Sequence, residues 1–101
     1  MRDIIATAEL DGTLIATTTK GRLVEGNVYF PASDVRTELL SSSPLTTLCP
    51  WKGIARYRHL TTEGRVVKNA AWTYPVPLPF AWFVRDRLAF ELGSGVTITY
   101  R

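Results

Sequence analysis

The residues with the greatest potential for chemistry stand together in one short motif, Cys49-Pro50-Trp51-Lys52-Gly53. A lysine ammonium favours the thiolate form of a nearby thiol, and an indole ring can partly desolvate a lysine. A reactive Cys49 and an anion-binding Lys52 are therefore both feasible. For Cys49, a small buried hydrophobic side chain is the favoured alternative, because free cysteine is commonly buried. For Lys52, ligand binding and simple solvation both remain open.

A second motif adds a carboxylate and a phenol. Glu25 stands beside the Gly26-Asn27 pair, and Tyr29 follows on the returning strand. If this hairpin folds over the first motif, Glu25 pairs with Lys52 or acts as a general base, and Tyr29 donates a hydrogen bond. A solvated Glu25 at an exposed turn is the favoured alternative, because glutamate is usually exposed.

A third motif contributes an amide and two aromatic rings. Asn69 can fix a ligand through its side-chain amide, with Trp72 and Tyr74 as aromatic walls, although Trp72 is equally consistent with a core residue. The catalytic residues, if there is a reaction, stay unassigned. The predicted ligand-binding residues are Glu25, Tyr29, Cys49, Trp51, Lys52, Asn69, Trp72 and Tyr74.

Metal sites and the common nucleophile arrangements are not indicated. Cys49 is the single cysteine and His59 the single histidine, so they cannot supply the four ligands of a structural zinc site or form an internal disulfide. Strand rise alone separates these two residues by roughly 20 Å or more, which argues against a Cys-His pair. No serine nucleophile motif or phosphate-binding glycine loop is present. We expect no metal and no cofactor, and the sequence leaves open whether the protein is an enzyme.

Composition indicates one globular domain spanning residues 1–101, with 46% hydrophobic and 21% charged residues. The net charge of +3 is too mild to indicate a nucleic-acid binder. Glu9 and Asp11 interrupt the apolar start, and prolines interrupt the longest apolar stretch, residues 75–84. We therefore expect neither an export signal nor a membrane span, and a cytoplasmic protein.

Strand signals recur at short intervals along the chain. Residues 4–10 place apolar side chains at alternate positions, which predicts a strand with one buried face. Asp11-Gly12 then predicts a hairpin turn, Lys20-Gly21 a second turn, and Gly26-Asn27 a third. Three turns so close together predict a meander of antiparallel strands.

Two further hairpins are expected in the second half of the chain, one around Glu63-Gly64 and one around Gly93-Ser94-Gly95. Residues 41–47, SSSPLTT, are expected to be a loop. These elements predict a mainly β fold, at the border of α+β. It would be a small barrel, or two or three antiparallel sheets over a common core.

Two short helices are expected between the strands. Ser33 can cap a helical turn that begins at Asp34, with Val35 and Leu39 as its buried stripe. Pro79 is placed to open the second helix, residues 79–84.

The segment 79–84, PFAWFV, is apolar on every side. Such a helix needs cover on all its faces, so its excess apolar surface is expected to face a second copy of the chain. The alternative is that the segment is not helical and threads through the core. A self-associating interaction module, forming a homodimer through this segment, is therefore one candidate function.

Four motifs, at residues 24–31, 49–57, 69–77 and 88–90, resemble in order and spacing the family catalogued as domain of unknown function 427. The resemblance implies bent antiparallel sheets in a tent-like arrangement, and it implies little about activity. The family has been labelled nucleotidyltransferase-like, but the carboxylate clusters that hold catalytic magnesium are missing from this sequence, so that label is not adopted. The favoured function is binding of a small ligand, anionic if Lys52 takes part, in a pocket lined by the VEGNVYF, CPWKG and NAAWTY motifs.

Overall fold

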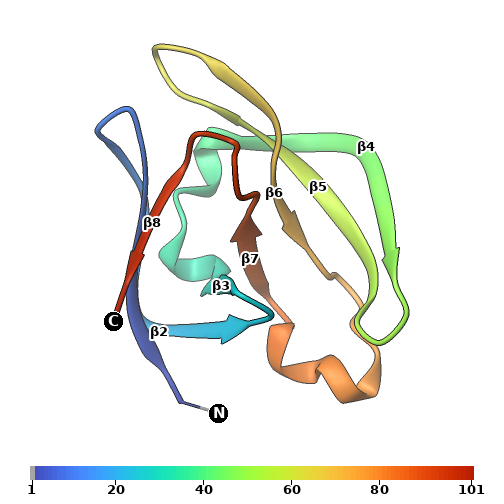
Figure 1. Cartoon of the computed structure of the whole chain (residues 1–101). Coiled ribbons are helices and arrows are strands. Elements are labelled where there is room, and N and C mark those ends of the chain that lie inside the picture. Colours follow the sequence, from blue (N-terminus) through green and yellow to red (C-terminus); the bar gives the residue numbers. More distant parts are fainter. Residues whose placement is uncertain (1) are drawn as a thin grey trace.

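A computed structural model describes residues 2–101, which form one open, eight-stranded antiparallel sheet in the order β4-β5-β6-β7-β3-β2-β1-β8 (Figure 1). The strands are β1 (Ile4–Leu10), β2 (Thr13–Val24), β3 (Asn27–Pro31), β4 (Leu40–Cys49), β5 (Gly53–Thr61), β6 (Val66–Thr73), β7 (Arg87–Phe90) and β8 (Thr97–Tyr100). Three short 3-10 turns are η1 (Ala32–Asp34), η2 (Thr37–Leu39) and η3 (Pro79–Val84).

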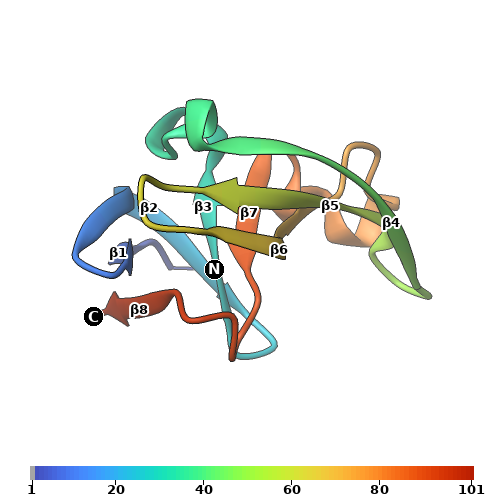
Figure 2. The ribbon, with the colours of Figure 1, turned by 90° about the horizontal axis from the view of Figure 1, so that it is seen from above.

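The sheet is bent rather than closed. In Figure 1, β1, β2 and β8 form one wall and β4, β5 and β6 the other, with β3 and β7 between them; Figure 2 shows the same bend from above. Strands β4 and β8 are free edges of the sheet. The predicted mainly β, antiparallel fold is confirmed, and the description as barrel-like holds only loosely.

The central strands are buried on both faces, because adjacent residues alternate between two hydrophobic clusters. In β3, Phe30 belongs to core 1 and Tyr29 to core 2; in β6, Ala71 and Trp72 divide in the same way. Core 1 comprises Ile4, Ala6, Ala8, Leu10, Ile15, Ala16, Val28, Phe30, Val35, Leu60, Ala70, Ala71, Leu88 and Phe90. Core 2 comprises Val24, Tyr29, Ala55, Trp72, Tyr74, Ala81, Val84 and Ala89.

Local turn signals locate three hairpins well. The predicted turn at Asp11-Gly12 joins β1 to β2, and the one around Glu63-Gly64 joins β5 to β6. The turn between β2 and β3 is shifted by one residue and centres on Glu25-Gly26, whose φ angles are +53° and +81°. Two consecutive positive φ angles are typical of the type I′ hairpin turn, which matches the twist of the strands.

The turn predicted at Lys20-Gly21 is wrong, because β2 continues through it. The first part of β2 pairs with β1 and its last part with β3, so one long strand serves both hairpins. Gly21 stands opposite Ile4, where a Cβ atom would meet the Cγ1 and carbonyl oxygen of Ile4 at 3.2 Å. This glycine permits close packing and does not reverse the chain.

The hairpin predicted around Gly93-Ser94-Gly95 is also wrong. Strand β7 pairs with β3 and β6 in the middle of the sheet, whereas β8 pairs with β1 at the far edge. The glycines mark a crossing between distant strands. Their turn propensity reveals that the chain changes direction but not which strand it then joins.

The loop predicted at residues 41–47 is a strand, since these residues lie within β4. As an edge strand with mostly exposed side chains, β4 has no apolar alternation to reveal it. Its pairing with β5 shifts between Ser42 and Thr46, and Pro44 lies inside that bulge, where no ladder hydrogen bond is required.

The helix expected at Asp34 is replaced by η1 and η2. Val35 is buried and Leu39 packs against core 1, as the stripe predicted, but Ser33 makes no capping bond. The turn η3 begins at Pro79 as predicted. Within the described part of the chain, the structure contains no helix of the length and apolarity needed to cross a membrane.

Candidate functional site

Lys52 is the most unusual side chain of the molecule. It is buried, with 5% of its surface exposed, and its ammonium forms an ion pair with Glu25. The Nζ atom also lies 5.0 Å from the ring centroid of Trp51, 5.6 Å from that of Tyr74 and 5.9 Å from that of Tyr29. Ring faces attract cations electrostatically. These five residues are called the Lys52 cluster below.

The backbone at the start of β5 positions Lys52. Gly53 has a φ of +114°, and a Cβ atom there would lie 3.3 Å from the carbonyl oxygen of Val76. Leu78 donates its N–H to the carbonyl of Lys52 at 3.0 Å. The close approach that glycine permits therefore fixes Lys52 against the segment leading into η3.

Glu25 reaches Lys52 from the β2–β3 turn. Its side chain is 53% exposed, in contrast to its lysine partner. Glu25 has a φ of +53° in this turn, and its half-exposed carboxylate lies on the solvent side of the buried ammonium.

The pair is charged at neutral pH. Its hydrogen bond to Lys52 holds the pKa of Glu25 below its usual value. Burial acts to lower the pKa of Lys52, but the hydrogen bond to Glu25 and the nearby tyrosines outweigh it, so this pKa is raised. Burial raises the pKa of Tyr74 to about 12, and the phenol therefore stays protonated.

Trp72 packs against Tyr29 of the Lys52 cluster. The indole Nε1–H of Trp72 donates to the hydroxyl of Tyr29 at 3.2 Å, and the two rings meet edge to face at 6.3 Å. Two residues absent from the predicted site extend this packing. Tyr57 lies 6.1 Å from Trp72, and Phe83 lies 6.0 Å from Trp51, both between ring centroids. Tyr57 shares the strand face of Ala55, a period-two signal that could have identified it.

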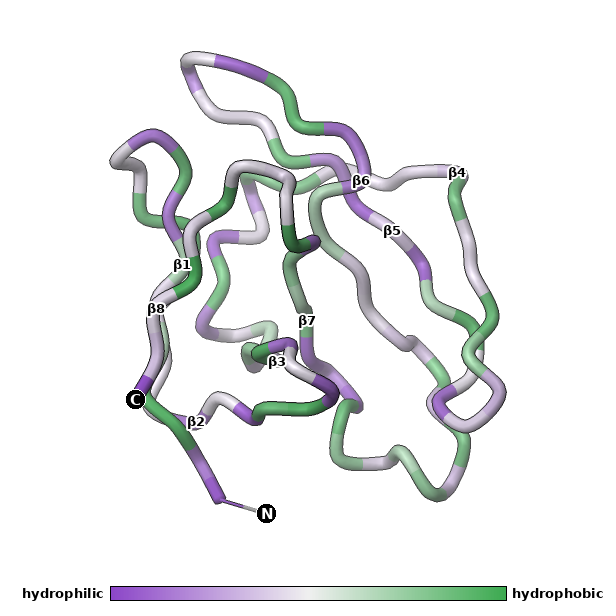
Figure 3. The backbone as a smooth tube through the Cα atoms, viewed as in Figure 1, coloured by the Kyte–Doolittle hydropathy of each residue, from purple (hydrophilic) through white to green (hydrophobic). Residues whose placement is uncertain are grey.

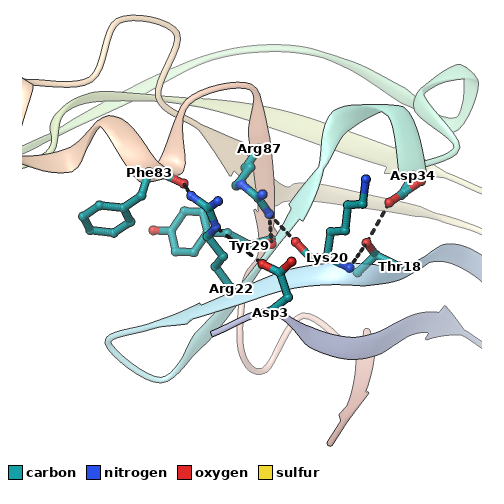
Figure 4. Close-up of polar contacts among 8 residues, drawn as sticks. All are labelled: Asp3, Thr18, Lys20, Arg22, Tyr29, Asp34, Phe83 and Arg87. Atoms are coloured by element: carbon teal, nitrogen blue, oxygen red, sulfur yellow. Dashed lines mark hydrogen bonds and ion pairs between the residues drawn. The ribbon is translucent and has the colours of Figure 1, made fainter. Parts of the chain in front are cut away.

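Two arginines anchor the strands behind the cluster (Figure 4). Arg87 of β7 donates to the carbonyl oxygens of Lys20 at 2.6 Å and Tyr29 at 3.3 Å, and Arg22 of β2 donates to that of Phe83 at 3.1 Å. Burial, followed by the neighbouring Arg22 guanidinium, lowers the pKa of Arg87. These bonds tie β7 and η3 to the β2–β3 hairpin and so hold Tyr29 in place.

Cys49 and Asn69 differ in their placement. Cys49 is half-buried and packs against core 2, near the rest of the predicted site. Asn69 lies elsewhere, in a bulge of β6 with a φ of +55°. Its side-chain oxygen accepts a hydrogen bond from Ser43, and its backbone N–H donates to Nδ1 of His59 at 3.1 Å. Seven of the eight predicted residues are thus brought into one region.

None of the hollows described within residues 2–101 is lined by a residue of the Lys52 cluster. One hollow of about 590 Å³ is lined by residues such as Ser42, Arg58 and Leu88. In that same range, no group of three or more His, Cys, Asp or Glu side chains is arranged to hold a metal ion.

The fold and the cluster together define a small open antiparallel β domain with two cores and a buried, ion-paired lysine. Residues 5–100 match the model of the family described as domain of unknown function DUF427, and the chain belongs to this family, as its four motifs predict. No curated protein was found to match the chain.

Proposed function

We propose that the domain binds a small anionic ligand through the Lys52 ammonium. The observation that carries this proposal is the asymmetry of the ion pair: a buried cation is matched by a carboxylate that is half exposed and sits on a two-residue turn. Burying a charge costs free energy that a well-packed apolar side chain would not. Perturbed, buried ionisable groups occur preferentially at functional sites.

In this proposal, the ligand's anionic group takes the place of Glu25. Rotation of Glu25 into water leaves the ammonium facing solvent, still surrounded by the rings of Trp51, Tyr29 and Tyr74. The hydrogen bond to Glu25 raises the pKa of Lys52 in the paired state, and the incoming anion replaces that carboxylate beside a cation in a partly desolvated place. The aromatic rings then provide the walls for the rest of the ligand.

A thermal-shift screen tests the proposal. Small carboxylates and phosphate esters are the probes, and the proteins are wild type, Lys52→Met and the matched control Lys20→Met, whose lysine is exposed. At least one anion should raise the unfolding midpoint of wild type and Lys20→Met but not of Lys52→Met. Anions that stabilise all three proteins equally, or none, would exclude Lys52 as the binding group.

Glu25→Gln provides the second arm of this test. Because Glu25 competes with the ligand for Lys52, its neutral replacement should bind the same anion more tightly than wild type does. Weaker binding would instead mean that the ligand needs the carboxylate itself.

A second candidate function is self-association through the apolar segment before and within η3 (Figure 3). Phe80 is 87% exposed, Val76 81% and Trp82 56%, whereas Ala81 and Val84 are buried in core 2. Exposed apolar patches frequently mark protein interfaces. A second copy of the chain is the proposed partner.

Sedimentation velocity over a wide concentration range tests the second candidate. Wild type should show a concentration-dependent dimer, and Phe80→Glu should be monomeric. The control is Leu92→Glu, which changes an exposed leucine outside the segment and should dimerise as wild type does. A wild-type monomer at every concentration would dismiss self-association.

A further inference from the structure

A groove opens on the core 1 face of the sheet, where the segment of η1 and η2 leads into β4 beside β5 (Figure 2). Its volume is about 590 Å³, which lies within the usual range for small-molecule sites. Arg58 of β5 lines the groove and pairs in register with Ser42 of β4 and Ala71 of β6. Residues directly opposite each other share one face of the sheet, and Ala71 belongs to core 1, so Arg58 points to the core 1 face. The two tyrosines of the Lys52 cluster belong to core 2, so the groove and that cluster are separate sites.

Arg58 and Ser42 form a preassembled pair of hydrogen-bond donors in this groove. Arg58 is partly buried, and its Nη1 donates to the hydroxyl oxygen of Ser42 at 2.9 Å. Within residues 2–101, the Ser42 hydroxyl donates to no protein acceptor, and no carboxylate lies within ion-pair distance of Arg58. A guanidinium has five N–H donors, so most of those of Arg58 and the hydroxyl proton of Ser42 are available to the same acceptor group.

The charges of the lining favour a ligand with one negative charge. Arg58 is the single cationic residue that lines the groove within the described residues 2–101. Asp86 also lines the groove, and its carboxylate pairs with its sequence neighbour Arg85 at 3.7 Å. A dianion would therefore bring a second negative charge into a groove that already holds a carboxylate and has only one cation. A carboxylate is a monoanion, and its two oxygens match the planar fork of a guanidinium.

An apolar side chain lies next to the donor pair. Leu40 stands two residues before Ser42 on β4, so the two side chains share a face, and Leu40 pairs in register with Leu60, two residues after Arg58. Diagonal neighbours on one face of an antiparallel pair are about 7 to 8 Å apart, which a short aliphatic chain can span. Leu40 lines the groove and is only partly buried against core 1, so it has apolar surface that a ligand can cover.

We propose that this groove binds a small aliphatic monocarboxylate. The ligand's carboxylate accepts hydrogen bonds from the guanidinium of Arg58 and the hydroxyl of Ser42, and its alkyl chain lies on Leu40. The two donor groups are themselves in contact at 2.9 Å, so one carboxylate reaches both. This site goes beyond the proposed anion site at the Lys52 cluster and does not depend on it.

Titration calorimetry on the full chain tests the proposal with acetate, butanoate and 4-methylpentanoate as probes. 4-Methylpentanoate should bind best, because its longer chain covers more of the apolar surface of Leu40. 4-Methylpentanamide keeps the alkyl chain but is neutral, so it should bind at least about tenfold more weakly, as expected for the loss of charge-assisted hydrogen bonds. The dianion 3-methylbutyl phosphate should also bind more weakly than 4-methylpentanoate.

Three variants locate the binding site. Arg58→Gln should weaken the binding of 4-methylpentanoate at least about tenfold and remove its advantage over the amide. Ser42→Ala removes the second donor and should weaken binding about tenfold, with the guanidinium still favouring the acid over the amide. The control is Arg101→Gln, which removes an exposed arginine outside the groove and should bind as wild type does.

Lys52→Met distinguishes this proposal from the anion site at the Lys52 cluster. Binding of 4-methylpentanoate that is lost in Arg58→Gln and kept in Lys52→Met supports the groove, whichever anions the Lys52 cluster takes. Binding that is lost in Lys52→Met and kept in Arg58→Gln would overturn the proposal. It would equally be overturned by no heat of binding for any of the three carboxylates at millimolar concentration, by equal affinity for the acid and its amide, or by tighter binding of the phosphate.

Discussion

At the scale of single residues, the Lys52 ammonium illustrates how a charge survives burial. Its desolvation is offset by one carboxylate and by three ring faces, so the folded protein keeps it protonated. A hydrophobic residue would fill the same space at less cost. Packing alone therefore does not explain why a lysine occupies this position. Because both partners of the Glu25–Lys52 pair are charged, the contribution of the pair to stability can be measured through its pH dependence.

The stability of the Glu25–Lys52 pair should depend on pH in a defined direction. The folded-state pKa of Glu25 is lowered, so its contribution is present above the usual glutamate pKa of about 4.3 and is lost as pH falls through the folded-state pKa. The pKa of Lys52 is raised, so its contribution is lost only as strongly alkaline pH passes the folded-state pKa. Between these limits the contribution should stay constant.

Chemical denaturation of wild type and Glu25→Gln at several pH values measures this contribution. The difference in unfolding free energy between the two proteins should be constant near neutrality and shrink below about pH 4. The same comparison in a Lys52→Met background should show little pH dependence. A difference that grows on acidification would contradict the ion pair.

Trp72→Phe should be far more destabilising than Trp82→Phe. Trp72 is buried and donates a hydrogen bond to Tyr29, whereas Trp82 is largely exposed. We expect a loss of about 2 kcal/mol for Trp72→Phe, from the bond and the space left by the smaller ring, and a change within about 0.5 kcal/mol for Trp82→Phe. Urea unfolding followed by circular dichroism gives both values, and equal losses would show that Trp72 is not a packed core residue.

At the scale of elements, the sequence predicts what is local. Hairpins with a short turn and an alternating apolar strand, such as the one around Glu63-Gly64, follow from period two and turn chemistry alone. The exposed edge strand at residues 40–49 does not, because its side chains face water on both sides and carry no alternation. Strand β7 pairs with β6, whereas β8 pairs with β1. Turn propensity cannot predict this difference, because it describes the local chain and not which distant strands pair.

The candidate site, like the fold, is predictable from the sequence where it depends on local features and not where it depends on the details of strand pairing. Seven of its predicted residues lie in one region because their motifs belong to strands that pair or to turns beside those strands. Proximity in the sequence predicts that Asn69 lies with Trp72, but in the bulge of β6 it contacts Ser43 and His59 instead. In this bulge three residues of β6 stand opposite one residue of β5, which changes which side chains lie together, and no pattern in a single sequence predicts it.

Gly21 permits close packing of β2 against Ile4 of β1, and this packing can be tested by substitution. Gly21→Ala places a Cβ atom 3.2 Å from the Ile4 carbonyl oxygen, whereas Gly64→Ala meets nothing within 4 Å. Both substitutions reduce the entropy of the unfolded chain equally, so the comparison isolates the contact. Gly21→Ala should be less stable than Gly64→Ala by about 1 to 2 kcal/mol in urea unfolding. Equal stabilities would mean that β2 has room at this point.

At the scale of the whole molecule, the two cores share their central strands. Neighbouring residues of β3, β6 and β7 belong to opposite cores, so a shift of these strands disturbs both faces at once. The Lys52 cluster lies on the core 2 side, and the hollow lined by Ser42, Arg58 and Leu88 lies on the core 1 side. A ligand that binds the Lys52 cluster should therefore stabilise the entire sheet rather than one wall of it.

Leu60→Ala tests this coupling, since Leu60 is fully buried in core 1 and Trp72 reports on core 2. The substitution should cost about 2 to 5 kcal/mol of unfolding free energy. Because the shared strands make unfolding cooperative, the urea midpoint seen by tryptophan fluorescence should fall by the same amount as the midpoint seen by far-ultraviolet circular dichroism. Val84→Ala, in core 2, should likewise move both midpoints together. If Leu60→Ala shifted only the circular dichroism transition, the two cores would unfold separately, and the open sheet would consist of two weakly coupled halves.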